Sequence, residues 1–121
     1  MAVVRYLVED IERSIEFFTS RLGFTLETQM GSAFAIVRLG DLELWLSGPQ
    51  SSAARPMPDG ARPAPGGWNR IVVRVEELAA IAATLNEVGI RFRGELVSGP
   101  GGKQLLIEDS EGNPIELFEP R

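Results

Sequence analysis

The chain has 121 residues, of which 44% are hydrophobic and 24% are charged, and this length and composition are those of one globular domain. It contains no histidine and no cysteine, which excludes a histidine-based catalytic triad, a thiol nucleophile, a Cys/His zinc site and a disulfide. The formal net charge of -5 argues against nucleic acid and anionic membranes as partners, because both attract clustered Lys and Arg. No apolar run is long enough to span a membrane, and no signal-peptide pattern follows Met1, so we expect a cytoplasmic protein.

The first part of the chain, residues 1–47, predicts the element order βαβββ. A β-branched and aromatic run at 3–8 indicates a strand, and apolar residues then recur at helical spacing over 11–22. Asp10 is the expected N-cap of this helix, and Gly23 is expected just after its last turn. Three short strands separated by glycine turns follow, at 24–30, 33–39 and 42–47.

Proline and glycine are frequent in residues 48–67, which excludes a helix or a central strand there and predicts a linker or a lid. After the linker the order βαβββ returns, with a helix expected at 77–88 and Gly89 at its end. The strands of this second half are expected at 68–75, 91–97, 102–109 and 113–118.

Two short sequence matches in the same order indicate an internal duplication. They pair Val8-Glu9-Asp10-Ile11 with Val75-Glu76-Glu77-Leu78, and Leu42-Glu43-Leu44-Trp45 with Ile115-Glu116-Leu117-Phe118. We therefore predict a single α+β domain over 1–121, with module 1 at 1–47, a linker at 48–67 and module 2 at 68–121.

Two stretches of the chain also carry a family resemblance. One is 8–18 followed by Leu22-Gly23-Phe24, and the other is the predicted C-terminal hairpin at 108–117, with Ser110 where proline is usual. Both resemble the vicinal oxygen chelate (VOC) superfamily, which includes glyoxalase I, bleomycin resistance proteins and extradiol dioxygenases. The resemblance implies two βαβββ modules that form a curved mixed sheet around a cavity.

In the metal-dependent members of that superfamily, the resemblance implies one metal ligand on the first strand and one on the fourth strand of each module. Carried over to this sequence, the four positions are Val3, Glu43, Arg70 and Glu116. Neither of the two usual histidines is present, and Arg70 brings a permanent positive charge into the space of a divalent ion. We therefore expect no metal and no other cofactor.

Strand alternation places Glu43 and Trp45 on the side of their strand that faces away from the helix, and does the same for Glu116 and Phe118. A carboxylate next to a large aromatic side chain favours a ligand cavity over bulk water, and Arg70 is expected to be the counter-charge of both glutamates. The ligand-binding residues that we predict are Arg5, Phe34, Glu43, Trp45, Trp68, Arg70, Glu116 and Phe118.

Each of these assignments has an alternative. The two glutamates are also compatible with solvated strand positions, although we favour their lining a pocket. Arg5 is compatible with ordinary surface charge, and Trp45 and Trp68 are compatible with core packing. Tyr6 has the parity of the helix-facing residues, so we expect it to pack under the first helix and to have no functional role.

Three functions compete on this basis. The first is a metal-independent binding protein of the glyoxalase/bleomycin resistance type that sequesters a hydrophobic or aromatic metabolite or antibiotic. The second is a VOC-type enzyme, such as a lyase, isomerase or dioxygenase relative, with a non-standard site at Glu43 and Glu116, in which Glu116 is the candidate catalytic residue. The third is a structural or regulatory module without a small ligand. We also expect a homodimer, because single-chain relatives with two modules commonly pair modules across a two-fold axis.

Overall fold

The computed structural model describes all residues, Met1–Arg121. The chain divides into two compact units, Met1–Pro65 and Gly66–Arg121. The boundary between them lies inside the linker that the sequence predicts at 48–67. The single domain over 1–121 stays a prediction, and each unit is described here by itself.

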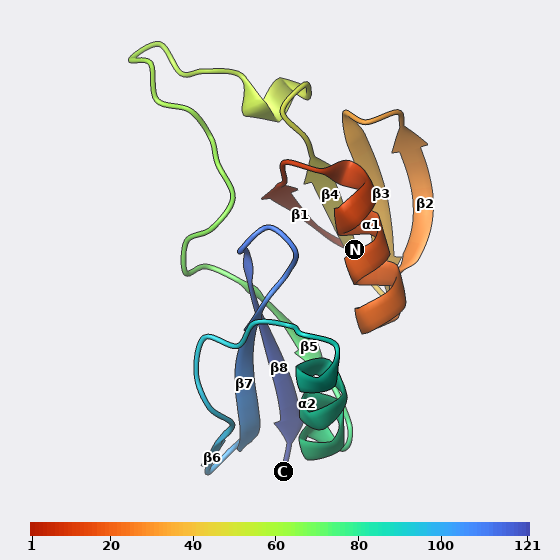
Figure 1. The fold of residues 1–121 in the computed structure, drawn as a ribbon, viewed down its shortest axis with the longest axis vertical. Coiled ribbons are helices and arrows are strands. Elements are labelled where there is room, and N and C mark those ends of the chain that lie inside the picture. The colour runs from red at the N-terminus through yellow and green to blue at the C-terminus, as the bar shows by residue number, and fades with distance from the viewer. The chain divides into compact units, whose positions relative to one another are not determined.

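The first unit contains one mixed sheet and one helix (Figure 1). The strand order of the sheet is β1-β4-β3-β2; β1 runs parallel to β4, and the other pairs are antiparallel. A short 3₁₀ turn, η1, follows at Ser52–Ala54. The elements are β1 (Ala2–Leu7), α1 (Ile11–Leu22), β2 (Thr25–Met30), β3 (Phe34–Leu39) and β4 (Leu42–Ser47).

Helix α1 begins and ends where the sequence predicts. A side-chain oxygen of Asp10 accepts a hydrogen bond from the backbone nitrogen of Arg13 at 3.2 Å, and Gly23 takes the left-handed conformation with φ 76°, which glycine adopts without strain. Phe18 is fully buried, and its ring packs edge-on against Tyr6 and Phe24 at centroid distances of 6.4 and 5.3 Å. Tyr6 therefore packs under the helix, as expected.

The second unit repeats this topology (Figure 1). Its strand order is β5-β8-β7-β6, again with the first strand parallel to the fourth and the other pairs antiparallel. The elements are β5 (Ile71–Arg74), α2 (Leu78–Glu87), β6 (Val97–Gly99), β7 (Gly102–Glu108) and β8 (Pro114–Pro120). Two four-stranded mixed sheets with one helix each confirm the α+β class and the duplicated βαβββ order, although the sheets are two and not one.

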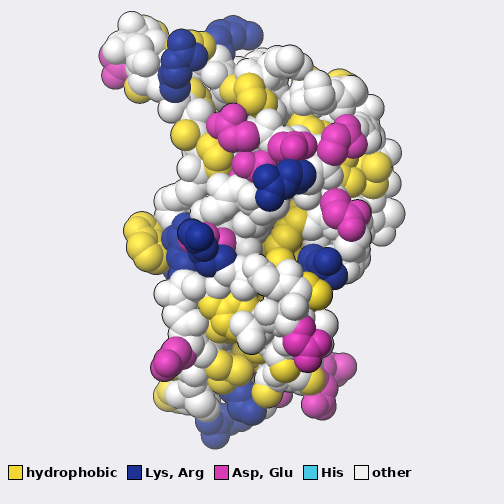
Figure 2. Space-filling model, in the orientation of Figure 1, with side chains coloured by type: hydrophobic (Ala, Val, Ile, Leu, Met, Phe, Trp, Pro, Cys, Tyr) yellow, Lys and Arg dark blue, Asp and Glu magenta, His cyan; other side chains and the backbone are white.

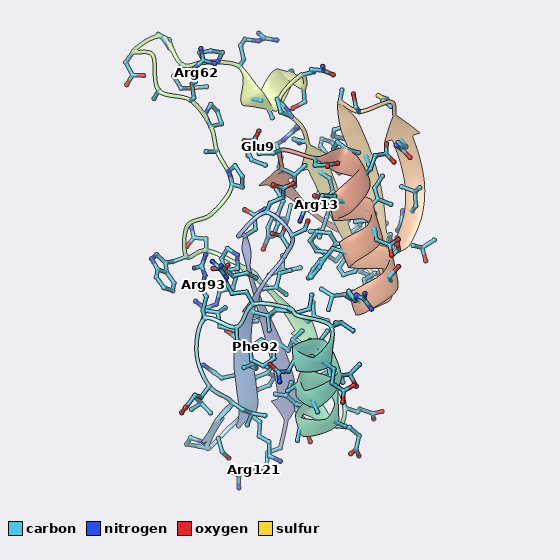
Figure 3. All side chains as sticks on the ribbon, viewed as in Figure 1. Glu9, Arg13, Arg62, Phe92, Arg93 and Arg121 are labelled. Carbon is cyan, nitrogen blue, oxygen red and sulfur yellow. The ribbon has the colours of Figure 1, made fainter.

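The sequence-based prediction is wrong for two strands of the second unit. The strand expected at 68–75 is confined to Ile71–Arg74, since pairing with β8 begins only at Ile71. The strand expected at 91–97 is absent, and only Phe92 forms an isolated bridge, to Ile107 (Figure 3). The next residues include Gly94, which disfavours extended structure, so strand pairing resumes only with β6.

The surface carries mixed charge. On the face drawn in Figure 2, acidic and basic side chains lie interspersed with one another. None of the helices has the length and apolar character needed to cross a membrane.

Candidate functional site

The sheet face of the first unit that lies opposite α1 gathers aromatic and charged side chains. Along β4, Leu44 and Leu46 are fully buried on the helix side, whereas Glu43 and Trp45 are half-buried on the other side. This is the alternation that the sequence predicts for the strand. It gives the first unit a face with both apolar surface and hydrogen-bonding groups.

This face contains a hollow of about 480 Å³, a size typical of small-molecule sites. Trp45 and Phe34 form an aromatic wall, with ring centroids 5.9 Å apart at an interplanar angle of 77°. Ile36 lies directly opposite Trp45 on the neighbouring strand. The lining residues are Arg5, Met30, Ala33, Phe34, Ile36, Trp45, Ser51 and Ser52.

The two serines reach the hollow because the chain leaves β4 at a glycine. The backbone nitrogen of Gly48 donates a hydrogen bond to the carbonyl of Ala33 at 2.9 Å, and a Cβ atom at position 48 would lie 3.0 Å from the carbonyl oxygen of Ser32. A residue without a side chain therefore permits this close approach. The sequence offered no signal that Ser51 and Ser52 would line a site, since they lie in a segment predicted only as linker.

Arg5 is held over the aromatic wall from β1. It pairs in register with Trp45, and its guanidinium carbon lies 5.1 Å from the centroid of the Trp45 ring, within the range of a cation–π contact. Nη1 of Arg5 donates a hydrogen bond to Oγ of Ser47 at 3.1 Å. The side chain is thus positioned by two neighbours on β4, although the residue as a whole is exposed.

Glu43 has both carboxylate oxygens engaged within the first unit. Oε1 accepts a hydrogen bond from Nε1 of Trp45 at 3.2 Å, and Oε2 accepts one from Nη2 of Arg38 at 2.8 Å. Arg38 also binds Glu27 at 2.6 Å, and this hydrogen bond lowers the pKa of the Glu27 carboxyl. The counter-charge of Glu43 in its own unit is therefore Arg38.

The sequence analysis missed Arg38, although a signal for it was present. The two-residue turn Gly40-Asp41 joins β3 to β4, and it sets a register in which Arg38 lies directly opposite Glu43. Opposite charges at facing positions of an antiparallel pair attract each other. Register counting from the turn would have found the pair.

The second unit holds its glutamate with a different arginine. Nε and Nη2 of Arg70 both donate to Oε1 of Glu116, at 3.2 and 2.9 Å. Arg70 lies immediately before β5, and Val72 is the residue that pairs in register with Glu116. Oε2 of Glu116 accepts no hydrogen bond from the residues of its unit. Arg70 thus meets one of the two glutamates for which it was proposed.

The four positions implied for a metal centre do not fit one. Val3 lies opposite Glu43 in the first unit, and the residue that lies opposite Glu116 in the second unit is Val72 and not Arg70, which precedes β5. The first strand of each unit therefore offers an aliphatic side chain where a donor would be needed. The carboxylates themselves are hydrogen-bonded to arginine, and no group of three or more acidic side chains in the chain is placed to hold a metal ion.

Trp68 lies before β5 and not on a strand, with 69% of its surface exposed. The guanidinium of Arg93 lies 4.5 Å from its ring centroid, and Arg93 also binds Oε2 of Glu108 at 2.7 Å and the carbonyl of Gly67 at 2.6 Å (Figure 3). Arg93 therefore connects the segment before β5 to the end of β7. Phe118 is half-buried on β8. Contact of Trp68 or Phe118 with a ligand stays a prediction.

The turn before β8 is organised by a buried carboxylate. Oδ1 of Asp109 accepts hydrogen bonds from the backbone nitrogens of Glu111 and Asn113, both at 2.8 Å, and Oδ2 accepts one from Nδ2 of Asn113 at 3.1 Å. Burial raises the pKa of the Asp109 carboxyl, and these hydrogen bonds oppose that effect. Because the turn leads directly into β8, Asp109 helps to set the position of Glu116.

A larger hollow, of about 680 Å³, lies in the second unit. It has no aromatic wall, and its lining is mostly charged. The lining residues are Arg74, Val75, Glu76, Glu77, Glu119 and Pro120. The first unit therefore has the hollow whose chemistry suits an organic ligand.

The chain belongs to the Glyoxalase/Bleomycin resistance protein/Dioxygenase superfamily, whose family model matches residues 1–117. This confirms the resemblance seen in the sequence. No curated protein matches the chain in sequence.

Several solved structures have the same fold. TnmS3, an antibiotic binding protein from Streptomyces sp. CB03234, is 26% identical, with a TM-score of 0.73 over 98% of this chain and 93% of that one. Lactoylglutathione lyase from Agrobacterium tumefaciens is 17% identical, with a TM-score of 0.77 over 98% and 92% of the two chains. TioX from Micromonospora sp. ML1 is 18% identical, with a TM-score of 0.77 over 98% and 97%. The last two similarities show the fold alone.

Proposed function

We propose that this protein binds and sequesters a hydrophobic or aromatic small molecule, a metabolite or an antibiotic, without using a metal ion. The observation that carries the proposal is the hollow of the first unit, in which Trp45 and Phe34 form an apolar wall and Arg5 and two serines provide polar groups. Small-molecule sites commonly combine apolar walls with a few polar anchors. The 26% identity to an antibiotic binding protein supports the same class of function.

The state of the two glutamates supports binding over catalysis. Both oxygens of Glu43 and one oxygen of Glu116 accept hydrogen bonds from arginine or tryptophan. A carboxylate tied in this way is a poor candidate for moving a proton to or from a substrate. One observation favours an enzyme as the second candidate: Oε2 of Glu116 accepts no hydrogen bond, so this atom could still act as a base.

The test begins with protein purified without a histidine tag. Native mass spectrometry should detect a co-purified organic ligand or a saturable site for added aromatic compounds, and elemental analysis should find no stoichiometric zinc, nickel or iron. The ligand should be recovered chemically unchanged after long incubation. A stoichiometric metal would contradict the metal-independent proposal, and conversion of the ligand would favour the enzyme.

We further propose that the functional form is a homodimer with two equivalent ligand sites. Closed two-fold assembly is the commonest oligomeric state, and the outermost strand β2 is exposed along its whole length. Sedimentation velocity at tens of micromolar should give the dimer mass. A single monomeric species would contradict this proposal.

A cytoplasmic location is likewise a proposal, and fractionation of the native host would test it.

A further inference from the structure

Arg5 is the one charged side chain that lines the hollow of the first unit. The two arginines that contact Glu43 and Glu116 have carboxylate partners: Arg38 binds Glu27 and Glu43, and Arg70 binds Glu116. Arg5 has none, although the chain contains 17 acidic and 12 basic residues. A cation that lines an apolar hollow thus has no counter-charge within its own unit.

Two contacts on β4 hold the guanidinium of Arg5 in position before any ligand binds. The hydrogen bond to Ser47 uses one N–H group of the guanidinium, and the contact with the face of Trp45 orients its plane. A guanidinium has five N–H donors in a planar fork, so the remaining donors are available to an acceptor in the hollow. A carboxylate is the acceptor that matches this fork with two parallel hydrogen bonds.

We propose that the hollow selects aromatic molecules that carry an anionic group, a carboxylate or a phenolate, with the anion bound by Arg5 and the ring lying against Trp45 and Phe34. This inference rests on the proposed function and adds the charge of the ligand to it. Binding of the ring excludes water from the guanidinium and strengthens its attraction to the anion. The protein as a whole is negatively charged, so its net charge would disfavour an anionic ligand. The preference for an anion therefore comes from Arg5 in the hollow.

The remaining lining side chains support this charge preference. None of them is acidic, and the nearby carboxylate of Glu43 already accepts hydrogen bonds from Arg38 and Trp45. A cationic ligand would find no free carboxylate in the hollow and would be repelled by Arg5. A neutral ligand would still make the apolar contacts and could still form hydrogen bonds with the hydroxyl groups of Ser51 and Ser52. It would form no ion pair with Arg5.

Three probes of one shape test the inference by isothermal titration calorimetry on the full chain: 2-naphthoate, 2-naphthamide and 2-naphthylmethylammonium. We expect 2-naphthoate to bind about tenfold more tightly than the amide, since a hydrogen bond to a charged group contributes on the order of a factor of ten or more. The ammonium compound should bind most weakly. The advantage of 2-naphthoate should shrink as salt concentration rises.

Two substitutions locate the effect. Arg5→Met should weaken binding of 2-naphthoate about tenfold more than binding of 2-naphthamide and so remove the advantage of the anion, because the amide carbonyl loses only a hydrogen bond and the carboxylate also loses an ion pair; Arg5→Gln provides a second variant if Arg5→Met folds poorly. Arg74→Met is the matched control, because Arg74 lies opposite Phe118 in the second unit as Arg5 lies opposite Trp45 in the first. This control should keep the full preference.

The possible failures are distinguishable. If the amide or the ammonium compound binds as tightly as 2-naphthoate, or if Arg5→Met keeps the preference, the inference about charge is wrong and the proposed binding function stands. If none of the three probes binds, both the inference and the proposed site for aromatic ligands are wrong.

Discussion

The two four-stranded sheets have the same strand order and the same valine–glutamate pairing between the first and fourth strands, yet their faces differ. In the first unit, Glu43 is held by Arg38 from the neighbouring strand and by the adjacent Trp45. In the second unit, Glu116 is held by Arg70, which precedes the first strand. The duplicated backbone has kept the position of the glutamate but not of its partner. Only the first unit combines its glutamate with an aromatic hollow.

The two helices show a similar difference. Asp10 immediately precedes α1, and its side chain accepts a hydrogen bond from the first turn of the helix. In α2 the corresponding residue, Glu77, adopts the left-handed conformation without a capping hydrogen bond, and Oε1 of Glu119 on β8 accepts the hydrogen bond of Leu78 N at 2.8 Å instead. One helix start is thus satisfied locally and the other through a tertiary contact, although the topology is the same.

The largest expected effect concerns the cores of the two units. Phe18→Ala removes a fully buried ring from the first unit and should lower the free energy of unfolding by about 3–5 kcal/mol. Trp45 and Trp68 lie in different units, so variants with a single tryptophan report each unit separately during urea denaturation. If 1–121 is one cooperative domain, Phe18→Ala shifts both transitions equally; a shift of the Trp45 signal alone would contradict the single domain.

The second prediction compares the aromatic residues at equivalent places on the fourth strands. Trp45→Ala should weaken binding of 2-naphthoate by about 1–3 kcal/mol, because the larger ring of the aromatic wall is lost. Phe118→Ala should have little effect if the hollow of the first unit is the whole site. An equal loss in both variants, measured by calorimetry, would instead support the wider set of eight predicted ligand-binding residues. Thermal melts of both variants control for folding.

The third prediction compares the two helix starts. Asp10→Ala should cost about 0.5–2 kcal/mol of stability, the usual range for loss of an N-cap. Glu119→Ala should cost a similar amount, since it leaves Leu78 N without its acceptor, whereas Glu119→Gln keeps an acceptor and should cost less. Urea denaturation measures all three variants. If Glu119→Ala is neutral, the tertiary cap of α2 does not contribute to stability.

The fourth prediction concerns the pH dependence of the turn before β8, which is organised by the buried Asp109, whereas its counterpart before β4 is the two-residue turn Gly40-Asp41. Burial raises the pKa of Asp109, so the native state binds this proton more tightly than the unfolded chain does, and stability falls as pH rises through the interval between the two pKa values. Asp109→Asn removes this titration. The stability of the unsubstituted protein relative to Asp109→Asn should therefore increase as pH falls through that interval. A difference that is constant with pH would contradict the raised pKa.

Several features of the fold could be predicted from local signals in the sequence. Asp10, Gly23 and the glycine turns mark element ends through backbone chemistry that operates within a few residues, and strand alternation placed Glu43 and Trp45 on the correct face. The missing strand at 91–97 shows the limit. Its apolar and charged residues satisfy a strand pattern, but Arg93 is bound by groups distant in sequence, at Glu108 and Gly67.

The candidate site was predictable in its aromatic residues and less so in its ion pairs. Large aromatic side chains with the right parity are visible in one strand, whereas the partner of a glutamate depends on pairing between strands. Arg38 could have been found by counting from the turn at Gly40-Asp41, because an antiparallel register is determined there. The contact of Arg70 with Glu116 could be anticipated only through the family resemblance. The role of Ser51 and Ser52 in lining the hollow depends on the path of a loop, for which the sequence has no pattern.

The smallest expected effect is the difference in coupling energy between the ion pairs Arg38–Glu43 and Arg70–Glu116. Glu116 and Arg70 are partly exposed, with side-chain exposures of 14% and 31%, and Glu43 and Arg38 have nearly the same values, 14% and 30%. Partly exposed ion pairs contribute about 0.2–1 kcal/mol, so burial alone predicts equal coupling energies. Arg38, however, is shared with Glu27, and Glu43 also accepts a hydrogen bond from Trp45.

Double-mutant cycles with Arg38→Met and Glu43→Gln, and with Arg70→Met and Glu116→Gln, measure the two couplings separately from other effects of each substitution. We expect the Arg38–Glu43 coupling to be the larger, because a network that is already ordered loses less side-chain entropy when the pair forms. Equal couplings would show that the neighbouring Glu27 and Trp45 add nothing to the pair, and the two units would then differ in the origin of the arginine but not in the energy of the contact.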